Sequence, residues 1–138
     1  MQVSIYSRAD YESLMQEGLP SNTAVICFYD RNKGSMELPL HNNSYQVAMD
    51  GPALDEADAL AFFVFYAKEA GLNIICVCET GMTTSAGCAA AIRQFFNGDG
   101  IEVFTNLHYF PDQQTYHEVF DALVEESFER GEVNCRIK

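Results

Sequence analysis

Basic residues are scarce in this chain of 138 residues, which has 8 lysines and arginines against 20 aspartates and glutamates and a formal net charge of -12. Nucleic acids and anionic membranes attract proteins through clusters of positive charge, so this shortage argues against both as partners. An acidic surface favours solubility, or a partner with a basic surface. We therefore expect neither nucleic acid nor membrane as a partner.

Long apolar segments and a secretion signal are also missing. The longest apolar run is residues 59–67, which is only nine residues, whereas a membrane-spanning helix needs about 20. Residues 1–8 contain no basic leader and no apolar segment that would mark the chain for secretion. The cysteines are odd in number and lack the spacing of a disulfide scaffold: Cys27, Cys76, Cys78, Cys88 and Cys135. Together these features predict a cytoplasmic protein in a reducing compartment.

Motifs for nucleotides and metals are absent or weak. The sequence has no Gly-x4-Gly-Lys-Ser/Thr and no Gly-x-Gly-x2-Gly, so nucleotide binding by those routes is unsupported. Cys76 and Cys78 with His108 and His117 do not have the Cys-x2-Cys pairs of structural zinc sites. We expect no metal and no cofactor. A redox pair between Cys78 and Cys88 is a minor alternative to two inert thiols.

Strand and helix patterns alternate along the chain, and no repeat or linker divides it, so we expect one domain over residues 1–138. Strands are expected at residues 3–6, 23–29, 45–49 and 73–77, and helices at residues 10–16, 55–70, 85–96 and 111–129. Asn97-Gly98 suits a left-handed cap at a helix end. The helix at 55–70 is apolar on nearly every side, which indicates burial between layers or a partial interface. This alternation predicts an α/β domain with a largely parallel sheet.

One strand is followed by a loop with the features of an anion site. After the apolar residues 73–77 the chain runs through Cys78 and Gly81 to a helix that starts with small residues near Ser85. Such a loop can turn successive backbone N–H groups inward, and the helix adds its positive N-terminal end. The same field would lower the pKa of Cys78. An inert cysteine at a strand end is the simpler alternative.

At this loop the sequence resembles a known family. Residues 78–87 read Cys-Glu-Thr-Gly-Met-Thr-Thr-Ser-Ala-Gly and resemble the Cys-x5-Arg-Ser signature of dual-specificity and tyrosine phosphatases. The likeness is strongest to small phosphatase-like proteins of bacteria and phages, whose loop runs about as Cys-Asp-Ala-Gly-Ile-Ser-Arg-Ser into an alanine-rich helix. Residues 89–92, 96–99 and 109–112 follow the same group's order of features.

This resemblance implies a cysteine-phosphatase-like α/β fold in a single domain, with a mostly parallel central sheet flanked by helices. It implies that Cys78 is the remnant of the nucleophile. It also implies a ligand-binding role for the residues that follow: Glu79, Thr80, Gly81, Met82, Thr83, Thr84 and Ser85. Asp50, before a Gly-Pro pair, stands where the family carries its general acid, and it is either a remnant acid or a turn residue.

Two positions depart from the family pattern. Val77 stands where a histidine usually precedes the nucleophile, and Thr84 stands where the arginine should be. An arginine binds phosphate through a planar fork of donors, whereas a threonine offers one neutral hydroxyl. Losing two charge-assisted hydrogen bonds removes roughly 3 to 6 kcal/mol. That corresponds to ~10² to 10⁴ in rate or affinity, so efficient phosphoryl transfer is not expected.

A replacement cation would have to come from elsewhere in the chain. The candidates are Arg8, Arg31, Lys33 and Arg93, but none has a spacing that directs it to the loop. Arg93 lies about two helical turns beyond Ser85 and should be distant from the loop. We expect all four to be solvated surface charges.

Three functions are compatible with these observations. The first is a catalytically impaired, phosphatase-like protein that binds a phosphorylated or other anionic ligand, or a protein partner. The second is an active cysteine-dependent enzyme with a replacement cation. The third is a phage or mobile-element protein that inhibits a host factor and uses its net charge of -12 to engage a basic surface.

Overall fold

The computed structural model describes residues 1–40, 43–49 and 56–131. Its centre is a sheet of four strands: β1 (Val3–Ser7), β2 (Thr23–Tyr29), β3 (Ser44–Ala48) and β4 (Asn73–Cys78). The strand order is β1-β4-β2-β3, and every pairing is parallel. This confirms the α/β fold with a parallel sheet that the sequence predicts. The expected candidates Asp50 and Cys135 lie outside the described residues.

The two central strands are buried on both faces because helices or loops cover each side of the sheet. Their side chains alternate between two apolar clusters, as the two-residue period of a strand requires. The larger cluster takes Ala24, Ile26, Phe28, Ile74, Cys76 and Cys78. The smaller cluster, on the opposite face, takes Val25, Cys27, Ile75 and Val77. Cys78 and Val77 therefore face different layers of the molecule.

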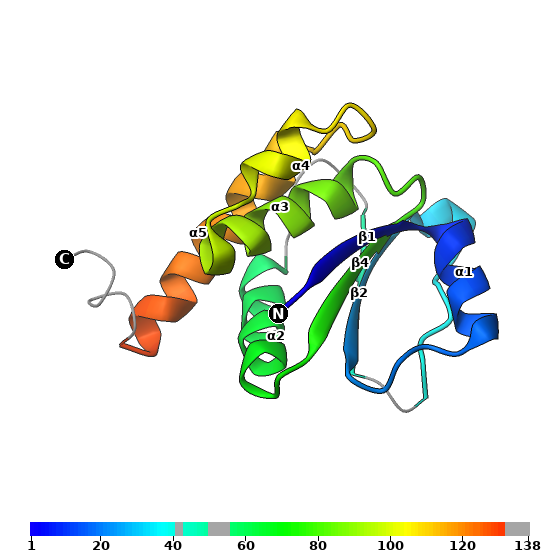
Figure 1. Ribbon diagram of the computed structural model, residues 1–138, viewed down its shortest axis with the longest axis horizontal. Coiled ribbons are helices and arrows are strands. Elements are labelled where there is room, and N and C mark those ends of the chain that lie inside the picture. Colours follow the sequence, from blue (N-terminus) through cyan, green and yellow to red (C-terminus); the bar gives the residue numbers. More distant parts are fainter. Residues whose placement is uncertain (41–42, 50–55, 132–138) are drawn as a thin grey trace.

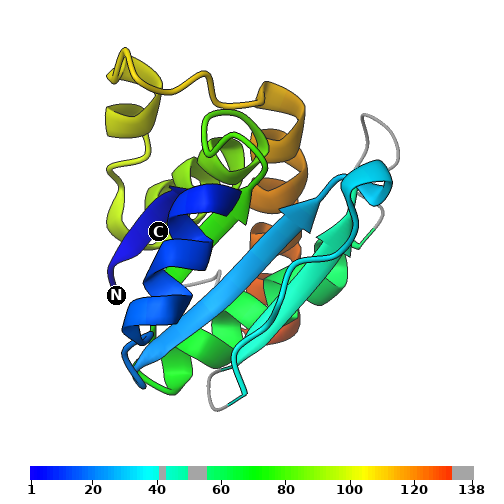
Figure 2. The ribbon, with the colours of Figure 1, turned by 90° about the vertical axis from the view of Figure 1, so that its right-hand side faces the viewer.

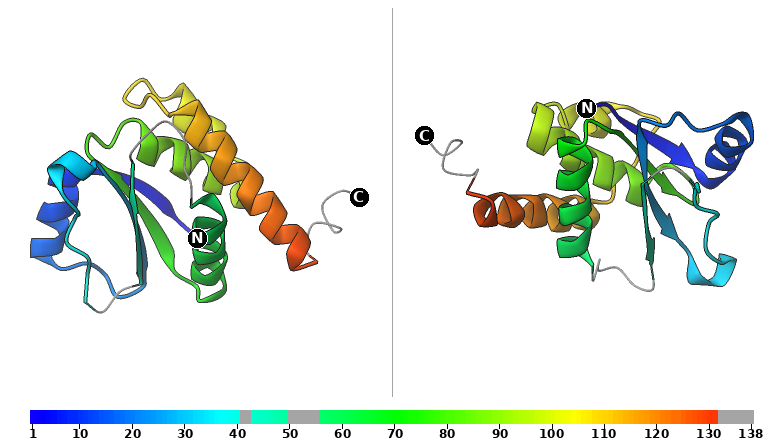
Figure 3. Two further views of the ribbon diagram at one scale, coloured as in Figure 1. Left: turned by 180° about the vertical axis from the view of Figure 1, so that it is seen from behind. Right: turned by 90° about the horizontal axis from the view of Figure 1, so that it is seen from below.

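Helices lie on both sides of the sheet. Helices α2 (Ala57–Glu69), α3 (Thr84–Asn97) and α5 (Gln113–Glu129) cover one face, and α1 (Arg8–Glu17) lies on the other (Figure 1; Figure 3 shows the same layers from behind and from below). Figure 2 looks onto the side of α1, where the segment between β2 and β3 also crosses. That segment begins with the short 3-10 helix η1 (Arg31–Lys33). No helix in the described ranges is long and apolar enough to span a membrane.

Small residues let α3 lie deep between the sheet and α5. Residues Ser85 to Ile92 of this helix are all buried. A methyl group added to Gly87 would lie 2.5 Å from the carbonyl oxygen of Asp112, so this position has room only for a hydrogen atom. The close packing holds the start of α3, and hence the loop before it, against the sheet.

Capping residues explain where the helices begin and end. Ser7 Oγ accepts the N–H of Asp10 (3.1 Å), so α1 begins at Arg8, two residues before the expected start. Asp112 Oδ2 accepts the N–H of Thr115 (2.9 Å) and caps α5. Gly98 ends α3 at φ 73°, which confirms the expected left-handed cap. Helix α4 (Ile101–Thr105) is not anticipated by the sequence reading, because five residues carry no helical period.

Helix α2 is only partly buried between layers. Leu60, Val64 and Phe65 are in the core, whereas Phe62 is 60% exposed and Tyr66 is 45% exposed. Full burial between layers, one of the two arrangements that the sequence indicates, is therefore wrong for the outer side of this helix. The described helix begins at Ala57, and the earlier part of the expected segment lies outside the described residues.

Candidate active site

The loop between β4 and α3 lies at the carboxyl end of a central strand, which is where parallel sheets commonly place their sites. Gly81 turns this loop at φ 71°. A methyl group at Gly81 would lie 2.5 Å from the backbone nitrogen of Ser7 and 2.8 Å from its Cα, so the loop rests directly on the junction of β1 and α1. Glycine is therefore needed at this position both for the positive φ of the turn and for the close packing.

Backbone hydrogen bonds tie the loop to two other segments. Arg8 N–H donates to the carbonyl of Glu79 (3.4 Å). On the other side, Phe110 N–H donates to the carbonyl of Met82 (2.8 Å), and Asp112 N–H donates to that of Thr83 (3.1 Å). The loop is thus fixed both to the first helix and to the segment before α5.

Cys78 lies at the base of the loop with only 5% of its surface exposed. Its Sγ is 3.1 Å from Ser85 Oγ and 4.0 Å from Thr80 Oγ1. Burial raises the pKa of Cys78, but hydrogen bonds from the Ser85 hydroxyl and from the N–H groups of Ser85, Thr83 and Gly81 lower it, and the net effect is a pKa below the ordinary thiol value. The loop therefore stabilises a thiolate, as the sequence predicts.

This environment gives a prediction for cysteine labelling. The alkylation rate of Cys78 by iodoacetamide should reach its half-maximum at a lower pH than that of a free thiol such as glutathione, because only the thiolate reacts and the donors of the loop lower the pKa of Cys78. Ser85→Ala should move the Cys78 curve to higher pH, since it removes a donor to the thiolate. Peptide mapping by mass spectrometry across pH measures both curves. A Cys78 midpoint at or above that of an ordinary thiol contradicts the prediction.

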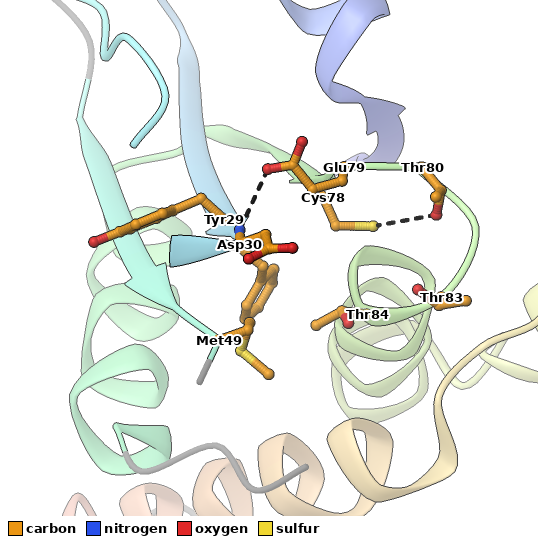
Figure 4. Close-up of a pocket in the computed structure, with 9 residues that line it drawn as sticks. Tyr29, Asp30, Met49, Cys78, Glu79, Thr80, Thr83 and Thr84 are labelled. Atoms are coloured by element: carbon orange, nitrogen blue, oxygen red, sulfur yellow. Dashed lines mark hydrogen bonds between the residues drawn. The ribbon is translucent and has the colours of Figure 1, made fainter. Parts of the chain in front are cut away.

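A cavity of about 210 Å³ opens beside Cys78 (Figure 4). It is lined by the ends of β2, β3 and β4, the loop and the start of α3: Phe28, Tyr29, Asp30, Met49, Cys78, Glu79, Thr80, Thr83 and Thr84. No lysine, arginine or histidine is among these described residues. Among the described lining residues, the charged side chains are the carboxylates of Asp30 and Glu79. Thr84 lies in the cavity wall at the position where the family resemblance expects an arginine.

Glu79 does not extend freely into the cavity. Its Oε2 accepts a hydrogen bond from Arg8 Nη1 (3.0 Å) and lies 3.3 Å from the donating N–H of Asp30. Arg8 also donates to the carbonyl oxygens of Gly34 (3.0 Å) and Ser35 (3.1 Å). The expectation that Arg8 is a solvated surface charge is therefore wrong, because its guanidinium bridges the loop to the segment after β2. The same contacts also hold Arg8 in place.

The other candidate cations are placed away from Cys78 or on the surface. Arg93 pairs with Asp99 (3.0 Å) and Glu102 (3.5 Å) near the far end of α3, so the expected distance from the loop is confirmed but its free solvation is not. These carboxylates hold the pKa of Arg93 above its ordinary value. Arg31 and Lys33 are exposed on η1.

Within residues 1–40, 43–49 and 56–131, the remaining cysteines and histidines do not form a second site around Cys78. Cys88 Sγ lies 3.9 Å from Cys76 Sγ, and both residues are fully buried, so the close thiol neighbour of Cys88 is Cys76. The weak metal set with His108 and His117 is not brought together, since the described part of the chain contains no group of three potential metal ligands.

Four cavity residues were not identified as site residues from the sequence: Phe28, Tyr29, Asp30 and Met49. A usable signal existed for Asp30, because it directly follows a buried strand, and the carboxyl ends of parallel strands meet at one edge of the sheet. Tyr29 and Met49 line the site because of the order of the strands in the sheet, and local sequence patterns do not reveal that order. The predicted loop residues Cys78, Glu79, Thr80, Thr83 and Thr84 do line the cavity.

Comparison with known proteins gives relatives in structure only. No family model matches the sequence, and no curated protein matches it. The crystal structure of DUSP15 is similar with a TM-score of 0.67 and 14% identity, over 97% of this chain and 91% of that one. The crystal structure of PTPMT1 in complex with PI(5)P has a TM-score of 0.61 and 12% identity, over 94% of each chain.

A third similar structure is that of a human tyrosine phosphatase-like serine/threonine/tyrosine-interacting protein, with a TM-score of 0.56 and 13% identity, over 90% of this chain and 87% of that one. At these identities the likeness establishes the fold. The chain thus has the fold of the dual-specificity and tyrosine phosphatases that use a cysteine, as the resemblance of its loop implies.

Proposed function

We propose that this chain is a catalytically impaired, phosphatase-like protein that acts by binding a partner protein. The observation that carries the proposal is the composition of the cavity beside Cys78, whose described lining residues include two acids and no cation. Phosphoryl transfer depends on positive charge placed around the transferred group. Thr84 supplies only a neutral hydroxyl at the point where that charge is needed.

The alternatives receive less support from the geometry. An active phosphatase needs a replacement cation, and Arg8, which contacts the cavity residue Glu79, already makes three hydrogen bonds. A phosphorylated ligand would meet the backbone donors of the loop without an arginine, so we expect its affinity to be lower by ~10² to 10⁴. Inhibition of a host factor is one form that binding of a partner could take. One of the similar structures is itself called phosphatase-like and interacting, which is in keeping with a binding role.

The test is hydrolysis of p-nitrophenyl phosphate by the full chain. We expect the Cys78-dependent rate, measured as the difference from a Cys78→Ser variant, to lie ~10² to 10⁴ below the usual enzyme range, because the described lining residues place no cation beside the thiolate to stabilise the transition state. The assay compares equal concentrations of both proteins. Hydrolysis that depends on Cys78 with a turnover number in the usual enzyme range, about 1 to 10³ s⁻¹, would sink the proposal.

A further inference from the structure

We propose that the cavity beside Cys78 receives a positively charged side chain, a lysine or arginine of a basic partner protein, in the space where a phosphatase holds phosphate. This inference rests on the proposed function, since it names the chemistry of the partner at that same site. Three features of the described residues support it: the hydrogen-bond donors of the loop are directed at Cys78, the walls of the cavity carry carboxylates, and an exposed apolar residue lies beside the loop.

The donors of the loop are directed at the sulfur of Cys78 and favour its thiolate form. Cys78 Sγ lies 3.1 Å from the Ser85 hydroxyl, and the N–H groups of Gly81, Thr83 and Ser85 also act on the sulfur. A phosphate placed above this sulfur would need further positive charge to offset its repulsion from the thiolate. The described cavity residues provide none. A cation placed there is instead attracted by the sulfur.

The walls of the cavity suit a cationic group. The carboxylate of Asp30 points toward the cavity from the end of β2 (Figure 4), and its Oδ1 accepts a hydrogen bond from the neutral N–H of Asn32 (2.9 Å). Glu79 adds a second carboxylate, whose charge is shared with Arg8. Phe28 and Met49 complete the wall, whereas the side chain of Tyr29 extends away from Cys78 (Figure 4). Carboxylates beside aromatic rings are a common environment for lysine and arginine side chains.

The surface next to the cavity offers an apolar contact for the same partner. Phe110 is 66% exposed, and its N–H donates to the carbonyl of Met82 in the loop (2.8 Å). A partner segment with an apolar residue near its basic one could cover this surface. The net charge of -12 complements a basic partner and would speed its approach.

The experiment uses three small probes and the isotopically labelled full chain. N-acetylarginine amide carries the proposed cation, N-acetylcitrulline amide is its neutral counterpart of nearly the same shape, and phenyl phosphate is the anion. We expect the arginine probe to shift the backbone amide signals of Asp30, Glu79 and Thr84 in NMR spectra. The citrulline probe should bind at least about threefold more weakly, because it lacks the charge.

Two variants test whether the cavity carries the binding. Asp30→Asn keeps an Oδ1 acceptor for Asn32 but removes the charge, and should weaken the arginine probe roughly three- to tenfold. Thr84→Lys places a cation in the cavity wall and should weaken it at least about tenfold. Asp121→Asn, which changes an exposed carboxylate on α5, is the matched control and should leave the binding unchanged.

The outcomes separate this inference from the proposed function. Equal binding of the arginine and citrulline probes, tighter binding of phenyl phosphate, or no signal shift with the arginine probe each overturn the inference while the chain remains non-catalytic. Hydrolysis of phenyl phosphate in the usual enzyme range that is lost in Cys78→Ser overturns the proposed function instead. A response of the arginine probe to Asp30→Asn and Thr84→Lys, with none to Asp121→Asn, supports the inference.

Discussion

Replacing Thr84 by arginine is expected to raise kcat/KM for p-nitrophenyl phosphate by roughly 10² to 10⁴ over the native chain. The loop already supplies a stabilised thiolate at Cys78 and inward N–H groups from Gly81, Thr83 and Ser85. Thr84 lines the cavity at the first residue of α3, so an arginine there can add two charge-assisted hydrogen bonds to the phosphate. Steady-state kinetics of the full chain measure the gain.

Two controls make this result specific. The gain should disappear in a Cys78→Ser, Thr84→Arg double variant, because the thiolate is the nucleophile. Thr105→Arg adds the same charge at an exposed position on α4 and should give no activity. If Thr84→Arg is folded, as judged by its circular dichroism spectrum and unfolding midpoint, and still has no activity, the missing charge at this position is not what silences the loop.

Gly81→Ala is expected to lower the free energy of unfolding by about 2 to 5 kcal/mol. One part of the loss is the left-handed backbone at φ 71°, which costs a residue with a side chain roughly 1 to 2 kcal/mol. The other part is contact of the new methyl group with the backbone of Ser7, whose nitrogen would be 2.5 Å away. Neither backbone segment can move without disturbing the β1–β4 pairing, so about 1 to 3 kcal/mol of overpacking is added.

Urea unfolding of the two glycine variants separates these contributions. Gly98 has nearly the same backbone angle, φ 73°, but a methyl group there meets no atom within 4 Å. Gly98→Ala should therefore lose only the conformational part, about 1 to 2 kcal/mol. Equal losses in both variants would show that the contact between Gly81 and Ser7 contributes nothing.

The parts of the fold that depend on local chemistry were predictable from the sequence. The dense apolar run of β2 and the left-handed cap at Gly98 are properties of neighbouring residues, and both lie where they were expected. Helix α4 was missed because five residues are too few to show a period. Full burial of α2 was a wrong prediction because Phe62 and Tyr66, although they are large aromatic residues, face away from the core.

The candidate site divides in the same way. The loop from Cys78 to Ser85 is contiguous, so its residues could be identified from their order alone. Arg8 and Glu79 are 71 residues apart in sequence, and they meet because β1 pairs with β4. No local sequence pattern predicts this contact. Asp30 enters the cavity because β2 is the other neighbour of β4. Strand order, which results from packing of the whole chain, thus decides which charges surround the cysteine.

The contacts of Arg8 bear on whether this loop can be transplanted. One guanidinium joins Glu79 in the loop to the carbonyl oxygens of Gly34 and Ser35, and Gly81 rests on the backbone of Ser7. The segment from β4 to α3 is therefore not a self-sufficient cassette. Grafted into another parallel sheet, it should keep its shape only if one neighbouring strand ends in a serine-arginine junction and the other is followed by a segment that presents two carbonyl groups.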